Sequence, residues 1–194
     1  MQFKINEVQF KVSFSFFAIF LLIIPTGNAR ICFYSLFASL YHEIIHIIFI
    51  YLFGSELKSF SLSLFGANII KNESIHITKI KESVINISAP LVNVITGLLL
   101  FNISKDFSLV NIVIGIFNIL PFYNFDGGRF LENVLLCVLS EKHTKLIIMM
   151  LSIFVTFVFT MLSFLIVVNG RNNYSLLILS LFMIFSVIAN IIRN

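Results

Sequence analysis

Long apolar stretches, separated by short polar segments, run through almost the whole of the 194-residue chain. A helix that crosses a bilayer needs about 20 largely apolar residues. The stretches that meet this requirement are Ile31–Phe53, Val84–Ile103, Phe107–Phe125, Leu146–Val168 and Tyr174–Ile192. A sixth stretch, Phe10–Ile24, is shorter and contains Lys11. The pattern predicts an all-α polytopic membrane protein with about six transmembrane helices.

The stretch Phe10–Ile24 has two interpretations. It is a retained first span, or it is the apolar part of a signal peptide that is cleaved near the small residues Gly27 and Ala29. We favour the retained span, because cleavage would leave five spans and an external N-terminus, against the distribution of charge described below.

Composition points to the same class. The chain is 59% hydrophobic and only 11% charged, whereas soluble domains carry about 25% charged residues. A globule of this size could not hide so much apolar side chain from water. The net charge of +4 includes no clustered basic run of the kind that binds nucleic acid, so a nucleic-acid partner is not expected.

The basic residues predict the orientation. With six spans and a cytoplasmic N-terminus, ten of the 13 lysines and arginines lie on the cytoplasmic side, as the positive-inside rule requires. These ten are Lys4, Lys11, Lys58, Lys71, Lys79, Lys81, Arg129, Lys142, Lys145 and Arg193. We expect an integral multi-pass membrane protein. The abundance of Ile, Asn, Lys and Phe indicates an AT-rich genome, which fits a bacterium, so the expected location is a bacterial cell membrane.

The cytoplasmic segment between the second and third spans contains two short alternating patterns. Ser59–Leu64 alternates polar and apolar residues, and Ser74–Thr78 does so again after Gly66 and Asn68. Period-two alternation is typical of strands. We therefore expect a small β-hairpin within residues 56–82, with an amphipathic loop on the membrane surface as the alternative.

Ionisable residues interrupt the second span near its middle. His42, Glu43 and His46 cannot all reach water from there, and such residues inside a span are functional candidates. Residues four apart lie on one face of a helix, so the two imidazoles can share one metal ion. Glu43 follows His42 directly in the sequence, so its carboxylate can reach a water on the metal without being a ligand. This His-Glu-x-x-His spacing is that of zinc hydrolases, and a polar cluster that only joins helices is the alternative.

Two histidines leave a catalytic zinc site incomplete, because such sites usually have three protein ligands. Asp126 is the candidate for the third ligand, since the other aspartate, Asp106, lies in a short external loop. Pro121 removes a helix hydrogen bond, and Gly127 with Gly128 allows tight backbone, so the end of the fourth span can bend toward the histidines. A helix cap that begins the next helix is the alternative role for Asp126.

At these residues the chain resembles the site-2 protease family of intramembrane zinc metalloproteases, including its sporulation-type branch. Besides the histidine motif, it has Asn118, Pro121, Asn124, Asp126 and Gly127 in place of the family's Asn-x-x-Pro-x-x-Pro-x-Asp-Gly pattern. Ala89-Pro90-Leu91-Val92-Asn93 is similar to the family's Gly-Pro-x-x-Asn element. Asn124 departs from the pattern, which commonly has Pro there.

The resemblance implies one membrane-embedded protease domain over residues 1–194, with a catalytic core at about 30–140 and two accessory helices in 146–192. It implies one zinc ion per chain held by His42, His46 and Asp126, with Glu43 as the general base. The substrate would be a membrane protein or a membrane-associated peptide, cut within the bilayer or at its cytoplasmic edge. It also suggests that the hairpin receives an extended substrate.

Two further residues and one rival function complete the expectations. Asn93 and Asn118 are polar groups in spans, and each either binds substrate backbone or joins helices. A non-catalytic metal-binding scaffold or transporter is the alternative function. A transporter would be expected to have polar residues in several spans, but the last two spans contain no acid, base or histidine. A non-catalytic protein would lack the base, but Glu43 is present. Neither the substrate nor any regulatory partner can be named from the sequence.

Overall fold

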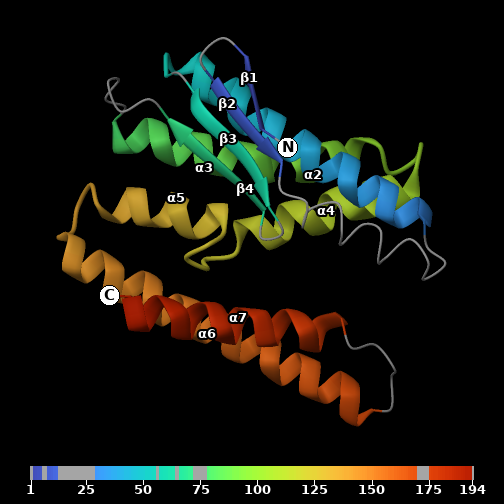
Figure 1. Cartoon of the computed structure of the whole chain (residues 1–194). Helices are drawn as coiled ribbons and strands as arrows, with labels where there is room; N and C mark the ends of the chain where they lie inside the picture. The colour runs from blue at the N-terminus through green and yellow to red at the C-terminus, as the bar shows by residue number, and fades with distance from the viewer. Residues whose placement is uncertain are drawn as a thin grey trace. The chain divides into compact units, whose positions relative to one another are not determined.

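The computed structural model describes residues 2–5, 8–12, 29–55, 57–63, 66–71, 78–169 and 175–193. These residues form six helices and four strands (Figure 1). The chain divides into two compact units, Met1–Ile119 and Leu120–Asn194. The single protease domain stays a prediction, and each unit is described in turn.

Three helices form the apolar part of the first unit: α2 (Ala29–Leu52), α3 (Lys79–Leu99) and α4 (Lys105–Ile119). Each of the three packs against the other two. Helices α3 and α4 approach closely at Gly97, because glycine has no side chain. A Cβ at this position would lie 2.8 Å from the Ser108 carbonyl oxygen, which leaves no room for it. Small residues at such crossings are typical of membrane helices.

The first unit also contains a four-stranded sheet with the order β1-β2-β3-β4. The strands are β1 (Gln2–Ile5), β2 (Val8–Val12), β3 (Leu57–Ser63) and β4 (Gly66–Lys71). Strand β2 pairs antiparallel with β1 and parallel with β3, and β3 pairs antiparallel with β4. Helices still make up most of the described residues, so the sheet is an addition to the helical architecture that the apolar pattern predicts.

The sheet corrects two expectations. The hairpin partner expected at Ser74–Thr78 is not seen among the described residues, because β3 pairs with Gly66–Lys71 and residues 72–77 lie outside them. The nearer partner leaves a shorter loop, which costs less entropy to close. The expected first span does not begin at Phe10, because that residue belongs to β2; residues 13–28 lie outside the described part.

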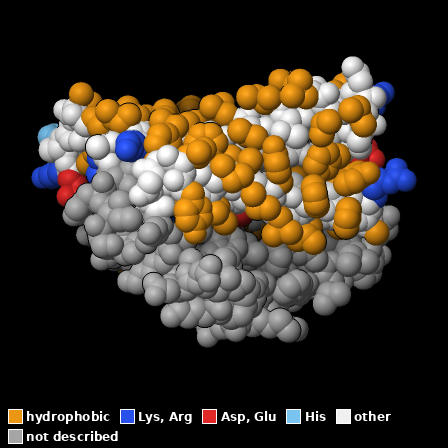
Figure 2. Space-filling model, turned by 90° about the horizontal axis from the view of Figure 1, so that it is seen from above, with side chains coloured by type: hydrophobic (Ala, Val, Ile, Leu, Met, Phe, Trp, Pro, Cys, Tyr) orange, Lys and Arg blue, Asp and Glu red, His pale blue; other side chains and the backbone are white. Residues whose placement is uncertain are grey.

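Four of the described helices are long and apolar enough to cross a membrane: α2, α3, α6 (Glu141–Val168) and α7 (Ser175–Arg193). Their exposed positions include many large apolar side chains, such as Leu98, Phe154 and Phe185. Figure 2 shows apolar side chains spread over one face, with lysine, arginine and acidic side chains mainly near its two ends. A lipid environment accounts for this exposure, and the chain is an integral multi-pass membrane protein.

The fourth span expected at Phe107–Phe125 is shorter as a helix, and it ends just before Pro121, where the sequence predicts the loss of a helix hydrogen bond. Helix α4 ends at Ile119, and its 15 residues span only about 22 Å, less than the roughly 30 Å of a hydrocarbon core. Pro121 explains the end, because proline has no N–H and disfavours helical backbone in the residue before it.

The second unit begins with the non-helical segment Leu120–Phe125, followed by α5 (Asp126–Leu135) and the pair α6 and α7. Its core consists of Phe122, Val155, Met183 and Val187. Phe122 is fully buried and belongs to the non-helical segment, so this segment is packed into the unit rather than looping away from it. Helices α6 and α7 lie side by side (Figure 1).

Candidate metal centre

The two motif histidines form a close, buried pair on α2. His42 and His46 are one helical turn apart, and their exposed fractions are 4% and 6%. Their ring centroids lie 4.9 Å apart with the planes nearly perpendicular, and each offers a ring nitrogen within 4.8 Å of the other's. The four-residue spacing of the motif therefore places both imidazoles on one face of α2, as the helical period predicts.

A backbone hydrogen bond sets the tautomer of His46. Its Nδ1 lies 3.0 Å from the carbonyl oxygen of Ile85 on α3. A carbonyl oxygen only accepts, so Nδ1 carries the proton and donates it, and Nε2 keeps its lone pair. Metal-bound histidines usually make this kind of second contact, which fixes the orientation of the ring. The hydroxyl of Ser88 donates to the same carbonyl oxygen at 2.8 Å.

The helix that carries the pair is tied to its neighbours by polar contacts. The hydroxyls of Tyr41 and Thr96 lie 3.0 Å apart across α2 and α3. The side-chain amide of Asn93, fully buried on α3, donates to the Ala38 carbonyl oxygen at 3.5 Å and to the Asn111 side-chain oxygen at 3.3 Å. These bonds limit how far α2 can slide or rotate, and they therefore hold the imidazoles in place.

The two asparagines that the sequence singles out lie in different environments. Asn93 links three helices, as just described, which is the contact expected of an interhelical residue. Asn118 is half-buried on α4, and its amide donates to the Ile114 carbonyl oxygen one turn earlier at 3.0 Å. Binding of substrate by either residue stays a prediction.

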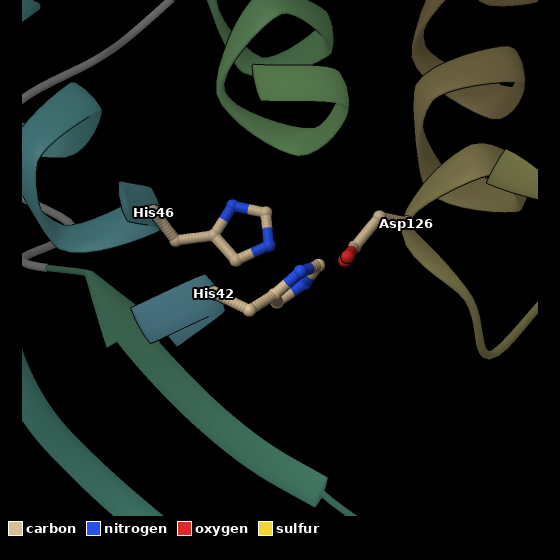
Figure 3. Close-up of side chains that lie close together, drawn as sticks. All are labelled: His42, His46 and Asp126. Carbon is tan, nitrogen blue, oxygen red and sulfur yellow. The ribbon is translucent and has the colours of Figure 1, made fainter. Parts of the chain in front are cut away.

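Asp126 is the first residue of α5, in the second unit. The cap of this helix is Phe125, so the capping interpretation of Asp126 is wrong, although a carboxylate in the first turn is still favoured by the helix dipole. Asp126 is half-buried, and so is Glu43 on α2. Figure 3 shows Asp126 at the start of its helix, and the two imidazoles on α2.

The backbone before Asp126 is shaped by a tight contact with Gly128. The Phe125 amide donates to the Phe122 carbonyl oxygen at 2.8 Å, which closes a turn. A Cβ at Gly128 would lie 2.5 Å from the Phe122 carbonyl carbon and 3.0 Å from the Tyr123 Cα. Only glycine fits here, so Gly128 allows the turn to pack on the start of α5.

Some of these contacts carry no signal in the sequence. The carbonyl of Ile85 is a backbone group that every residue has, and Ser88 is one of many serines in the chain. Only their position opposite His46 in the folded unit distinguishes them.

Comparison with solved structures finds a similar fold. The chain is similar to the "Site-2 Protease from Methanocaldococcus jannaschii", with a TM-score of 0.70 and 22% sequence identity over 96% of this chain and 93% of that one. Comparisons with protein-family models and with curated proteins give no match. At this identity the likeness shows that this chain and the archaeal protein share a fold.

Proposed function

We propose that this chain is an intramembrane zinc metalloprotease, which hydrolyses a peptide bond of a membrane-associated protein within the bilayer or at its cytoplasmic edge. The observation that carries the proposal is the buried pair of His42 and His46, with Glu43 beside it, in a helix that is long and apolar enough to cross a membrane. The shared fold with a protein titled a site-2 protease supports it.

The ligands proposed for the metal are His42, His46 and Asp126. The His46 tautomer leaves Nε2 available, and two imidazole nitrogens with one carboxylate oxygen are a donor set that zinc accepts. Each of the two imidazoles offers a ring nitrogen within 4.8 Å of the other's, a spacing that one ion can bridge. The residues present therefore fit a zinc ion.

A zinc ion in this position would supply Lewis-acid chemistry and bring the pKa of a bound water to near 7. Glu43 would take the proton from the attacking water and deliver it to the leaving amine, as a general base and then a general acid. It is suited to this because it follows His42 directly on α2 and is half-buried, which keeps it near the metal without making it a ligand.

Substrate binding is proposed to use the sheet. Strand β4 is at one edge of the described sheet, because its only neighbour in the strand order is β3. A peptide bond inside an intact helix is shielded, so the substrate must be extended before hydrolysis, and an edge strand can pair with an extended segment. The cytoplasmic N-terminus and the likeness to the sporulation-type branch remain parts of the proposal, and they rest on charge and motifs.

The test compares membranes from cells that produce either the wild-type chain or Glu43→Gln at equal levels. Mass spectrometry of membrane-protein fragments should find cleavage products that require the wild-type chain, since the variant keeps the metal ligands but lacks the base. A fragment pattern that is the same for both proteins, with metal bound in both, would instead identify a non-catalytic metal-binding scaffold.

A further inference from the structure

Two serines of the C-terminal helices hold the segment that leads into Asp126. The backbone amide of Tyr123 donates to the Ser152 hydroxyl oxygen on α6 at 3.0 Å. The phenol of Tyr123 donates to the Ser186 carbonyl oxygen on α7 at 2.6 Å, and the two hydroxyls lie 2.7 Å apart. The side-chain amide of Asn124 donates to the same Ser186 hydroxyl at 2.8 Å.

One of these bonds satisfies a backbone group that the break in the helix leaves unpaired, the amide of Tyr123. Non-helical backbone in a membrane protein needs partners inside the protein, because lipid offers none. Ser152 donates its own proton to the Ile148 carbonyl oxygen at 2.8 Å, so its oxygen is left to accept from Tyr123. The Ser186 side chain, in turn, is buried and contacts two successive residues of the segment.

The position of this segment is transmitted to Asp126. Only Phe125 separates Asn124 from Asp126 in sequence, and the packing of Gly128 on the Phe122 carbonyl couples the segment to the first turn of α5. A shift of Tyr123 and Asn124 away from α7 would therefore move the Asp126 carboxylate as well.

We propose that Ser186 is a positioning residue for Asp126 as a metal ligand, which makes α7 part of the metal centre rather than an accessory helix. This inference rests on the proposed function, because it requires that Asp126 bind the metal. It predicts that loss of one hydroxyl on α7 weakens metal binding although Ser186 itself is not a ligand.

The experiment measures zinc affinity of the full-length, detergent-purified chain by competition with a chelator, for wild type, Ser186→Ala and Ser186→Thr. A matched control is Ser180→Ala, since Ser180 is also a buried serine of α7 but bonds to Ser163 on α6, 3.3 Å away, and not to the segment before Asp126. The visible spectrum of bound Co²⁺ reports the geometry of the ligands in each variant.

We expect Ser186→Ala to weaken zinc binding on the order of tenfold, the lower end of the range seen when outer-shell partners are lost, because Ser186 acts on Asp126 through Tyr123 and Asn124. The Co²⁺ spectrum should change as well. Ser186→Thr keeps the hydroxyl and should restore both properties, and Ser180→Ala should leave both unchanged. Wild-type affinity and spectrum in Ser186→Ala would overturn this inference alone, as would an equal loss in Ser180→Ala. Absence of metal binding by the wild type would overturn the proposed function and this inference together.

Discussion

The substitution Gly128→Ala tests how closely the metal centre depends on the turn before Asp126. The added methyl group would lie 2.5 Å from the Phe122 carbonyl carbon and nearer still to its oxygen. Carbon atoms in contact are normally about 3.5 Å apart, so the backbone must give by roughly 1 Å. The atoms in the way are backbone atoms, which cannot rotate aside as a side chain can. The segment or the first turn of α5 must therefore move.

Two magnitudes follow from this displacement. Overpacking of a buried site costs about 1–3 kcal/mol, so the free energy of unfolding should fall by that amount. A misplacement of about 1 Å in a catalytic arrangement can lower the rate by roughly 10²-fold, so hydrolysis should fall much more than stability alone would explain.

The assay combines thermal unfolding with zinc affinity and cleavage, all on the purified full-length protein. Gly54→Ala is a useful comparison, because Gly54 has a left-handed φ of 76° and no neighbour within 4 Å of an added Cβ, so any effect there is backbone strain in the first unit. Normal zinc affinity and normal hydrolysis in Gly128→Ala would refute the argument that this contact places Asp126.

Three further predictions concern other parts of the molecule. Glu43→Gln should keep its metal, measured by elemental analysis, and lose about 10²–10⁴-fold in hydrolysis; a variant that still cleaves at the normal rate would exclude Glu43 as the base. Gly115→Ala would place a methyl group 2.7 Å from the Pro90 carbonyl oxygen, so thermal melts should show a loss of about 1–3 kcal/mol, and an unchanged melt would contradict the close packing of α3 and α4. Asn93→Ala should cost about 1–3 kcal/mol because it removes the buried donor to the Asn111 side-chain oxygen, whereas Asn118→Ala, whose contact is within its own helix, should cost less than half as much; equal losses would argue against the interhelical bonds.

The histidine pair and the long helices were predictable because their signals are local. A span is a run of apolar residues, and the spacing of His42 and His46 is set by the period of a helix, so both could be recognised without a tertiary structure. The end of α4 before Pro121 also has a local cause, although the apolar pattern continues to Phe125. The sequence predicts that Pro121 removes a helix hydrogen bond, and a bend there toward the histidines stays a prediction.

The sheet was not predictable in the same way. Its parallel pairing joins Gln9 to Ser59, positions far apart in the sequence, and strands as short as β1 and β2 carry too few residues for a clear alternation. The interactions around the candidate site are equally hidden. The bond from His46 to the Ile85 carbonyl depends on which helices meet, and the contacts of Ser186 depend on where the non-helical segment packs. Neither a backbone carbonyl nor a single serine can be recognised in the sequence as a contact of this kind.

The most direct test of the central claim is the zinc content of the purified wild-type chain beside His46→Ala and Asp126→Ala. It needs no substrate, and it tests the third ligand separately from the histidine pair. We predict about one zinc ion per wild-type chain, lost from both variants while each stays folded. Full zinc content in Asp126→Ala would remove that residue from the site, and a folded wild type without affinity for zinc would contradict the account as a whole.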